Sequence, residues 1–245
     1  MITIVLPAYN EELTLSPLLD ALADHLGEAK IPYQIIIVND GSTDGTAKII
    51  EKASRELPVI PIAHVQNQGL AETLKTGLLE AVKRASDRDI IVTMDSDNTH
   101  TPGLIMRMVR MLREGHDVVI ASRYQKGARV IGVPFSRRML SYGASVLFRL
   151  LFPMPGVKDY TSGYRAYRSD VIKNMFDSYG ESFIDEPGFS CMVDILLKLR
   201  KFPVIIGEAP LILRYDRKFS ASKMNVARTM RQTLRLIVKR RLNMP

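Results

Sequence analysis

Short apolar runs alternate with longer amphipathic segments through the first half of the chain. Five runs rich in Val and Ile predict β-strands: Thr3–Leu6, Tyr33–Asn39, Val59–Val65, Asp89–Met94 and Asp117–Ser122. Four of these runs are almost continuously apolar, which is typical of parallel strands that helices cover on both faces. The segments between them have helical periodicity: Glu12–Leu26, Gly45–Leu57, Leu70–Ala85 and Pro102–Arg113. This alternation predicts an α/β fold with an open, mostly parallel, doubly wound sheet.

The pattern is less regular after Arg123. Helical periodicity returns in three segments, Ser136–Phe152, part of Glu186–Lys201, and Asn225–Leu242. The segment Gly127–Pro134 predicts a loop, and further strands are expected at Tyr164–Tyr167, Val204–Ile206 and Ala209–Tyr215. We find no internal repeat and no linker. We therefore expect one domain over residues 1–224, followed by a C-terminal amphipathic helix (225–245) that is not an independent domain.

The net charge of +8 is concentrated near the C-terminus. Of the 34 Lys and Arg residues, ten lie from Arg214 onward, beside one of the 26 acidic residues. The preceding 213 residues therefore carry a net charge of −1. This distribution disfavours a protein that coats nucleic acid with its whole surface, and it favours one local contact with an anion.

The composition also narrows the cellular setting. The single cysteine, Cys191, cannot form an internal disulfide, which fits a reducing cytoplasm. The N-terminus lacks the basic start and the apolar run of a signal peptide. Arg149 and Pro153 interrupt the most apolar stretch, around Val146–Phe152, so we expect no membrane-spanning helix.

In open α/β sheets, ligands bind beyond the carboxyl ends of the strands, so the residues there are the candidates for chemistry. The first strand is followed by no glycine-rich turn, which disfavours a nicotinamide dinucleotide. Asp40 follows the second strand, where a turn and a helix cap would also explain it. Asp95 and Asp97 follow the fourth strand at spacing i, i+2, so their carboxylates converge and favour a cation between them and a ligand. Two solvated loop acids would give the same pattern.

Four motifs together identify a protein family much more specifically than any one of them does alone. They are Pro7–Glu11 (P-A-Y-N-E), Asn39–Gly45 (N-D-G-S-T-D-G), Gly69–Gly77 (G-L-A-E-T-L-K-T-G) and Asp95–Asp97 (D-S-D). In this order the chain resembles the family-2 glycosyltransferases with the GT-A fold. Within them it is most similar to the dolichol-phosphate mannose synthases and related polyprenyl-phosphate glycosyltransferases. The resemblance covers essentially the whole chain and implies a hexosyltransferase.

The resemblance implies a donor site for a nucleotide-sugar. Pro7, Tyr9 and Glu11 would line the nucleotide pocket, Asp40 would bind the base and Asp95 would contact the donor. Asp97 would hold Mg²⁺ or Mn²⁺ on the diphosphate, where a hard cation neutralises the charge of the leaving group. Thr99 stands where the mannose synthases have a glutamine that reaches the metal, so we expect its hydroxyl, His100 or water there. GDP-mannose is the expected donor, with UDP-sugars as the alternative.

The resemblance also places an acceptor site and a closing loop. Arg123, Arg137 and Ser141 would bind the acceptor phosphate, although ordinary surface residues would look the same. Arg217 and Lys223 belong to a segment similar to the family's R-x-x-G-x-S-K loop, in which the basic residues close over the donor diphosphate. Ser220 replaces the glycine of that loop.

We expect displacement with inversion at the anomeric carbon. An ionised phosphate acceptor needs only positioning, whereas a sugar hydroxyl needs a carboxylate to take its proton. Asp185 or Glu186 is the candidate base for a hydroxyl acceptor. Acids at a helix N-terminus would explain this pair equally well.

The last predicted helix suits a membrane surface. It combines an apolar stripe with Arg228, Arg231, Arg235 and Lys239, as in helices that lie on anionic lipid. The same stripe would also suit packing on the body of the protein. We therefore expect a cytoplasmic enzyme that is peripheral at the membrane, with a polyprenyl phosphate as acceptor. A nucleic-acid-binding module and a catalytically silent scaffold are the alternatives, and the lack of aromatic residues after Phe219 disfavours the former.

Overall fold

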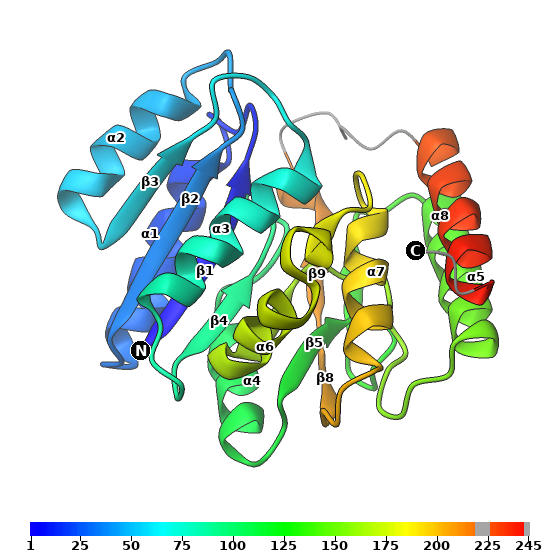
Figure 1. The fold of residues 1–245 in the computed structure, drawn as a ribbon. Helices are drawn as coiled ribbons and strands as arrows, with labels where there is room; N and C mark the ends of the chain where they lie inside the picture. Colours follow the sequence, from blue (N-terminus) through cyan, green and yellow to red (C-terminus); the bar gives the residue numbers. More distant parts are fainter. Residues whose placement is uncertain (219–225, 243–245) are drawn as a thin grey trace.

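The computed structural model describes residues 1–218 and 226–242, apart from the side chains of residues 226–228. A central sheet lies between helices, with two further helices beside one end of it (Figure 1). The strands are β1 (Ile2–Ala8), β2 (Tyr33–Asn39), β3 (Val59–Ala63), β4 (Ile90–Thr93), β5 (Val118–Ser122), β6 (Arg129–Ile131), β7 (Arg165–Arg168), β8 (Ile206–Pro210) and β9 (Ile212–Arg214). The helices are α1 (Leu15–Glu28), α2 (Thr46–Glu56), α3 (Leu70–Arg84), α4 (Leu104–Arg113), α5 (Phe135–Leu151), α6 (Ser169–Tyr179), α7 (Ser190–Leu199) and α8 (Val226–Arg241), with 3-10 turns η1 (Gly180–Ile184) and η2 (Tyr215–Arg217).

The main sheet has seven strands in the order β3-β2-β1-β4-β7-β5-β8. All neighbouring pairs are parallel except those of β7, which runs antiparallel to both β4 and β5. The carboxyl ends of β1, β2, β4 and β5 therefore meet at one edge. The predicted α/β architecture with a mostly parallel sheet is confirmed.

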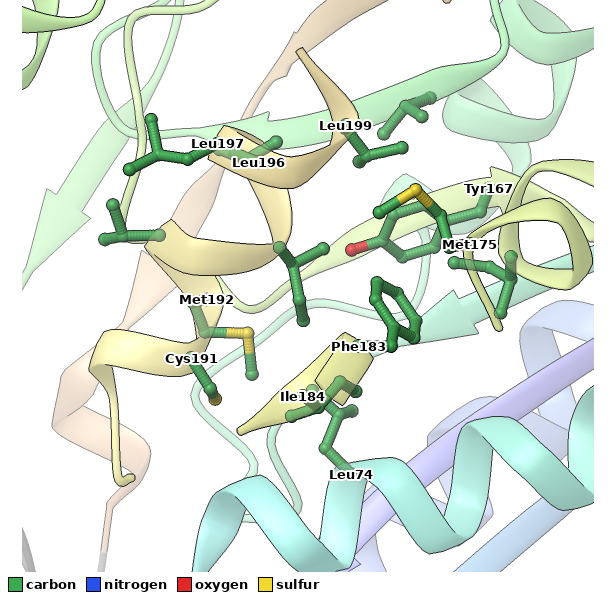
Figure 2. Close-up of a cluster of buried hydrophobic side chains, with 14 of the residues drawn as sticks. Leu74, Tyr167, Met175, Phe183, Ile184, Cys191, Met192, Leu196, Leu197 and Leu199 are labelled. Carbon is green, nitrogen blue, oxygen red and sulfur yellow. The ribbon is translucent and has the colours of Figure 1, made fainter. Parts of the chain in front are cut away.

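Each face of the sheet has its own apolar core. On one face, side chains of α1, α2 and α4 pack on residues such as Ile4, Ile37 and Val92. On the other face, α3, α6, η1 and α7 pack on residues such as Val5 and Tyr167. Figure 2 shows part of this second core, where side chains of η1 and α7 meet those of α3, α6 and β7. Strands buried on both faces explain the almost continuous apolar runs in the sequence.

Helix α8 packs on α7 and lies beside α5 (Figure 1). Leu236 and Ile237 are buried and join the second core, and Arg241 donates a hydrogen bond to the Leu151 carbonyl of α5 at 3.4 Å. Neighbouring apolar side chains of the same helix are exposed: Met230, Leu234 and Val238. No helix among residues 1–218 and 226–242 is long and apolar enough to cross a membrane.

The strand boundaries near the C-terminus differ from the predictions. The predicted loop Gly127–Pro134 contains the short strand β6, which pairs with β9 in a separate two-stranded sheet. The predicted strand Val204–Ile206 is wrong, because β8 begins at Ile206 and continues through Gly207 and Glu208. Glu208 tolerates this buried position because its Oε1 accepts backbone N–H groups of Lys158 and Asp159 at 2.6 and 2.7 Å.

Candidate active site

Two loops close together at the carboxyl edge of the sheet carry the D-S-D motif and the first motif. Ser96, between the two aspartates, donates a hydrogen bond to the Pro7 carbonyl of β1 at 2.7 Å. Asn98 has φ 59°, a left-handed conformation that asparagine tolerates better than most residues. The loop therefore turns sharply after Asp97 and remains fixed to β1.

The Asp97 carboxylate has partners on both oxygens. Thr99 donates to Oδ1 from its backbone N–H at 3.1 Å and from its hydroxyl at 2.7 Å. The Lys218 ammonium contacts Oδ2. Burial raises the pKa of Asp97, but Lys218, His100 and the Thr99 hydrogen bond outweigh it and lower that pKa overall. Asp97 is therefore ionised at neutral pH.

Asp95 faces a histidine that the sequence interpretation left as a minor alternative. The His100 Nδ1 accepts the backbone N–H of Asp95 at 3.3 Å, and His100 Nε2 lies 3.8 Å from Asp95 Oδ2. The His100 ring stacks on Tyr164 at 4.9 Å. Desolvation by the surrounding protein, with the charges of Asp97 and Glu11, raises the pKa of Asp95 against the opposing effect of His100 and Lys218.

The oxygen ligands at this edge suit a hard divalent cation. Asp97 and Asp95 offer carboxylates and Thr99 offers a hydroxyl, which are the ligand types that Mg²⁺ and Mn²⁺ prefer. Within the described part of the chain, no three His, Cys, Asp or Glu side chains are grouped so that they could hold a metal by themselves. A cation here would thus take its further ligands from water or from a substrate, since Mg²⁺ in proteins keeps several waters and also binds phosphates.

Pro7, Tyr9 and Glu11 lie at the same edge, at the end of β1 and in the loop after it. The Glu11 backbone N–H donates to the Thr46 hydroxyl at 2.8 Å, and its carboxylate accepts from the Thr14 hydroxyl at 2.6 Å. Glu11 is buried, and its charge affects the pKa values of Asp95 and Lys218. The structure therefore brings the first motif and the D-S-D motif together.

Asp40, the predicted ligand of the base, holds the start of α3. Its carboxylate accepts the backbone N–H groups of Gln68 and Gly69, both at 2.8 Å, and contacts His64 Nδ1 at 2.8 Å. Burial raises the pKa of Asp40, but these contacts lower it overall. The sequence interpretation missed His64, because a histidine one residue beyond β3 carries no distinctive pattern.

Arg123 forms a two-pronged ion pair with the buried Asp159. Its Nε and Nη2 donate to the two carboxylate oxygens at 2.8 and 2.7 Å, and Nη2 also donates to Thr161 at 2.5 Å. The Arg123 guanidinium lies 5.5 Å from the centre of the Tyr124 ring. Arg123 therefore fastens the segment before β7 to the end of β5.

Two tyrosines link the remaining predicted acceptor residues to this edge. The Tyr124 hydroxyl lies 2.9 Å from the Ser141 hydroxyl of α5, and Arg137 donates to the Tyr215 hydroxyl at 2.7 Å. Tyr215 begins η2, which also contains Arg217. Lys223 lies outside the described residues, as does Ser220. Arg137 and Ser141 thus line one side of α5, facing η2 and the end of β5.

Asp185 and Glu186 are paired with basic side chains of α7 and α8. Lys198 contacts Asp185 at 2.7 Å, and Lys239 contacts Glu186 at 3.0 Å. Burial raises the pKa of Asp185, but Lys198, Lys239 and Arg240 lower it overall. A carboxylate held in this way is a weaker proton acceptor than one with a raised pKa.

Known proteins resemble this chain in sequence. Residues 3–176 match glycosyl transferase family 2. The dolichol-phosphate mannosyltransferase of Pyrococcus furiosus is 30% identical over 198 residues, covering 80% of this chain, which spans about half (52%) of that relative. The undecaprenyl-phosphate mannosyltransferase of Micrococcus luteus is 29% identical, covering 90% of this chain and 86% of the relative. The polyprenol monophosphomannose synthase of Mycolicibacterium smegmatis is 29% identical, and the match covers 91% of this chain and 80% of that relative.

A solved structure resembles the chain in fold. Glucosyl-3-phosphoglycerate synthase from Mycobacterium tuberculosis, solved with Mn²⁺, UDP and phosphoglyceric acid, matches with a TM-score of 0.69 at 21% identity. The match covers all of this chain and 79% of the chain of the synthase. At that identity the likeness concerns the fold, and it agrees with the predicted GT-A architecture. With the family match over residues 3–176, the chain belongs to glycosyl transferase family 2.

Proposed function

We propose that this protein transfers mannose from GDP-mannose to a polyprenyl phosphate, with inversion at the anomeric carbon and with Mg²⁺ or Mn²⁺ bound. The observation that carries this proposal is the meeting of Asp95, Asp97 and Glu11 at the carboxyl edge of a GT-A sheet. Three similar proteins, whose names describe transfer of mannose to polyprenyl phosphates, support the choice of sugar and acceptor.

In this proposal the first motif and Asp40 hold the nucleotide, while Asp95 and Asp97 face the sugar diphosphate. Asp97 and Thr99 would hold the cation, which neutralises the charge of the departing diphosphate. The acceptor oxygen attacks the anomeric carbon from the opposite face, and the bond from that carbon to the diphosphate oxygen breaks. A phosphate acceptor is already ionised, so no residue of the chain has to take a proton. The ion pairs of Asp185 and Glu186 agree with this assignment.

Arg123, Arg137 and Ser141 are the proposed acceptor-binding residues. Guanidinium groups suit a phosphate because they donate several hydrogen bonds in one plane. The contact with Asp159 holds Arg123 at the end of β5, and the contact with Tyr215 holds Arg137 beside η2. Arg217 and Lys223 would close over the donor diphosphate.

The lipid acceptor requires contact with a membrane surface. Helix α8 exposes Met230, Leu234 and Val238 beside the exposed Arg231 and Arg235. The neighbouring α5 adds exposed large apolar side chains: Phe135, Met139, Leu140, Tyr142, Leu147 and Leu150. Exposed apolar groups between basic ones favour an interface with anionic lipid. We therefore propose that α5 and α8 contact the bilayer.

The test is a transfer assay with GDP- and UDP-sugars, Mg²⁺ or Mn²⁺, and a polyprenyl phosphate in vesicles. We expect Asp97→Asn to lower the transfer rate by about 100-fold or more, because the ligand of the cation is lost. The matched control is Asp87→Asn, at an exposed position after α3. If no nucleotide-sugar raises the melting temperature of the wild-type protein with either cation, the proposal is wrong.

A further inference from the structure

Lys218 is a basic residue at the site that none of the matched motifs assigns. It follows η2, and its backbone N–H donates to the Tyr215 carbonyl at 3.2 Å. Its side chain is only 13% exposed, and Nζ lies 5.7 Å from the centre of the Tyr215 ring. The ammonium reaches across to Oδ2 of Asp97. Lys218 is therefore held inside the site rather than extended into solvent.

Through this contact the positively charged ammonium of Lys218 lies on the Asp97 carboxylate, which is the proposed ligand of the divalent ion. The other oxygen of Asp97 is occupied by the two hydrogen bonds from Thr99. A metal ion bound to Oδ2 would lie next to the ammonium, and two positive charges at that distance repel each other. Lys218 and a divalent cation thus compete for one oxygen atom.

The charges around Lys218 hold its ammonium in place. It contacts Asp97 Oδ2, and the carboxylate of Glu11 attracts it as well. The carboxylates of Asp95, Asp97 and Glu11 lie close enough to interact, and Lys218 and His100 offset part of their mutual repulsion.

We propose that Lys218 is a positioning residue that occupies the cation site on Asp97 until a divalent ion and a nucleoside diphosphate arrive together. The inference rests on the proposed function, since it takes a nucleotide diphosphate as the ligand. A cation bound to Asp97 would displace the ammonium, which would then donate hydrogen bonds to the anionic diphosphate. The free protein therefore binds the cation weakly, and the cation and the nucleotide strengthen each other's binding.

Direct measurement of Mn²⁺ binding, by the electron paramagnetic resonance signal of free Mn²⁺, tests this inference without any transfer reaction. In the absence of nucleotide, we expect Lys218→Met to bind Mn²⁺ about tenfold more tightly than the wild type, because the competing charge is gone. Methionine keeps a long unbranched side chain. The control Lys173→Met removes an exposed lysine from α6 and leaves the affinity unchanged. Adding Asp97→Asn to Lys218→Met abolishes the gain.

The same titration with GDP or UDP present tests the second half of the inference. We expect nucleotide to raise the Mn²⁺ affinity of the wild type more than that of Lys218→Met, which lacks the ammonium that contacts the diphosphate. Equal Mn²⁺ affinities of the two proteins without nucleotide, or no binding by either, would overturn the inference. A protein that shows the tenfold difference but transfers no sugar retains this inference and loses the proposed function.

Discussion

Arg123 combines a packing role with its proposed role in phosphate binding. Its partner Asp159 is fully buried, so removal of the guanidinium leaves a carboxylate inside the protein without its counter-ion. Burial raises the pKa of Asp159, but Arg123 outweighs it and holds that pKa below the ordinary value. The pair therefore stabilises the folded protein wherever Asp159 is ionised.

We expect Arg123→Ala to lower the free energy of unfolding by about 3–5 kcal/mol, because it leaves a buried carboxylate unpaired. Urea denaturation measures this effect. Arg137→Ala is the control, since it removes a single hydrogen bond to Tyr215 and should cost about 1 kcal/mol. Equal losses in the two variants would show that the Asp159 pair is not a stabilising contact.

At the level of single residues, the site was predictable where it depends on strand ends. Asp40, Asp95 and Asp97 could be located because parallel strands bring their carboxyl ends to one edge. Lys218 and His64 could not be located in this way, because their partners Asp97 and Asp40 lie 121 and 24 positions away in the sequence. No sequence motif indicates contacts over such separations. Long-range partners of this kind need the fold itself.

Helix α3 packs unusually close to the sheet at Gly77. A Cβ there would lie 3.2 Å from Val38 Cγ2 and closer still to Val5 Cγ1. Glycine in a helix is unfavourable by itself, so its presence in α3 is explained by this close approach. In α5, a Cβ at Gly143 would meet nothing within 4 Å.

The two glycines give opposite predictions for the same substitution. Gly77→Ala should lower the free energy of unfolding by about 1–3 kcal/mol through overpacking. Gly143→Ala should raise it by about 0.5–1 kcal/mol through helix propensity. Thermal or urea denaturation of both variants measures the difference. A stabilised Gly77→Ala protein would contradict the close packing of α3 on β1.

Helix α8 offers a similar comparison between its two faces. Leu236 is fully buried and Leu234 is 57% exposed. We expect Leu236→Ala to cost about 2–5 kcal/mol of stability. Leu234→Ala should change stability by less than about 0.5 kcal/mol and weaken binding to anionic vesicles, as measured by sedimentation. Vesicle binding that is unchanged in Leu234→Ala would count against α8 as the lipid contact.

The elements that the sequence misplaced share a physical cause. Strand β6 has three residues, too few to show alternation, and its partner β9 lies more than 80 positions away. Strand β8 contains Gly207, Glu208 and Pro210, residues that are rare in strands, and tertiary contacts of Glu208 hold it in place. Four of the first five strands, β1, β2, β4 and β5, were predictable because burial on both faces dictates their composition. The division of the chain at residues 224 and 225 stays a prediction.

Over the whole molecule, buried carboxylates make stability depend on acid pH. Asp40 and Asp159 are buried and have lowered pKa values in the folded protein. A lowered pKa contributes stability above the pKa of the unfolded chain and loses it as the pH falls through the folded value. Each unit of lowering is equivalent to about 1.4 kcal/mol.

We therefore expect the free energy of unfolding to be constant near neutral pH and to fall steeply below about pH 4. Urea denaturation at pH 7 and at successively lower pH measures the change. Asp159→Asn should flatten part of the acid dependence, since one of the linked groups no longer titrates. A stability that rises toward acid pH would contradict these assignments.

The net charge of the molecule is also distributed unevenly between the body and α8. The body carries almost no net charge, while the basic residues of α8 from position 229 onward either pair with α7 and the segment before it or are exposed. Lys239 and Arg240 hold the helix in place through Glu186 and Asp194. Arg231 and Arg235 are exposed. The basic residues of α8 thus serve its packing and leave a charged outer face, which is the proposed contact with lipid.

The antiparallel strand β7 has a consequence for synthesis of the chain. It lies between β4 and β5, yet it is made after both of them. While the ribosome extends residues 123–164, strands β3, β2, β1 and β4 can form one parallel group with an exposed apolar edge at β4, and β5 has neither of its neighbours. Such edges invite pairing with other chains. Emergence of Arg165–Arg168 joins β5 to this group, so we expect the nascent protein to be most prone to aggregate just before that moment.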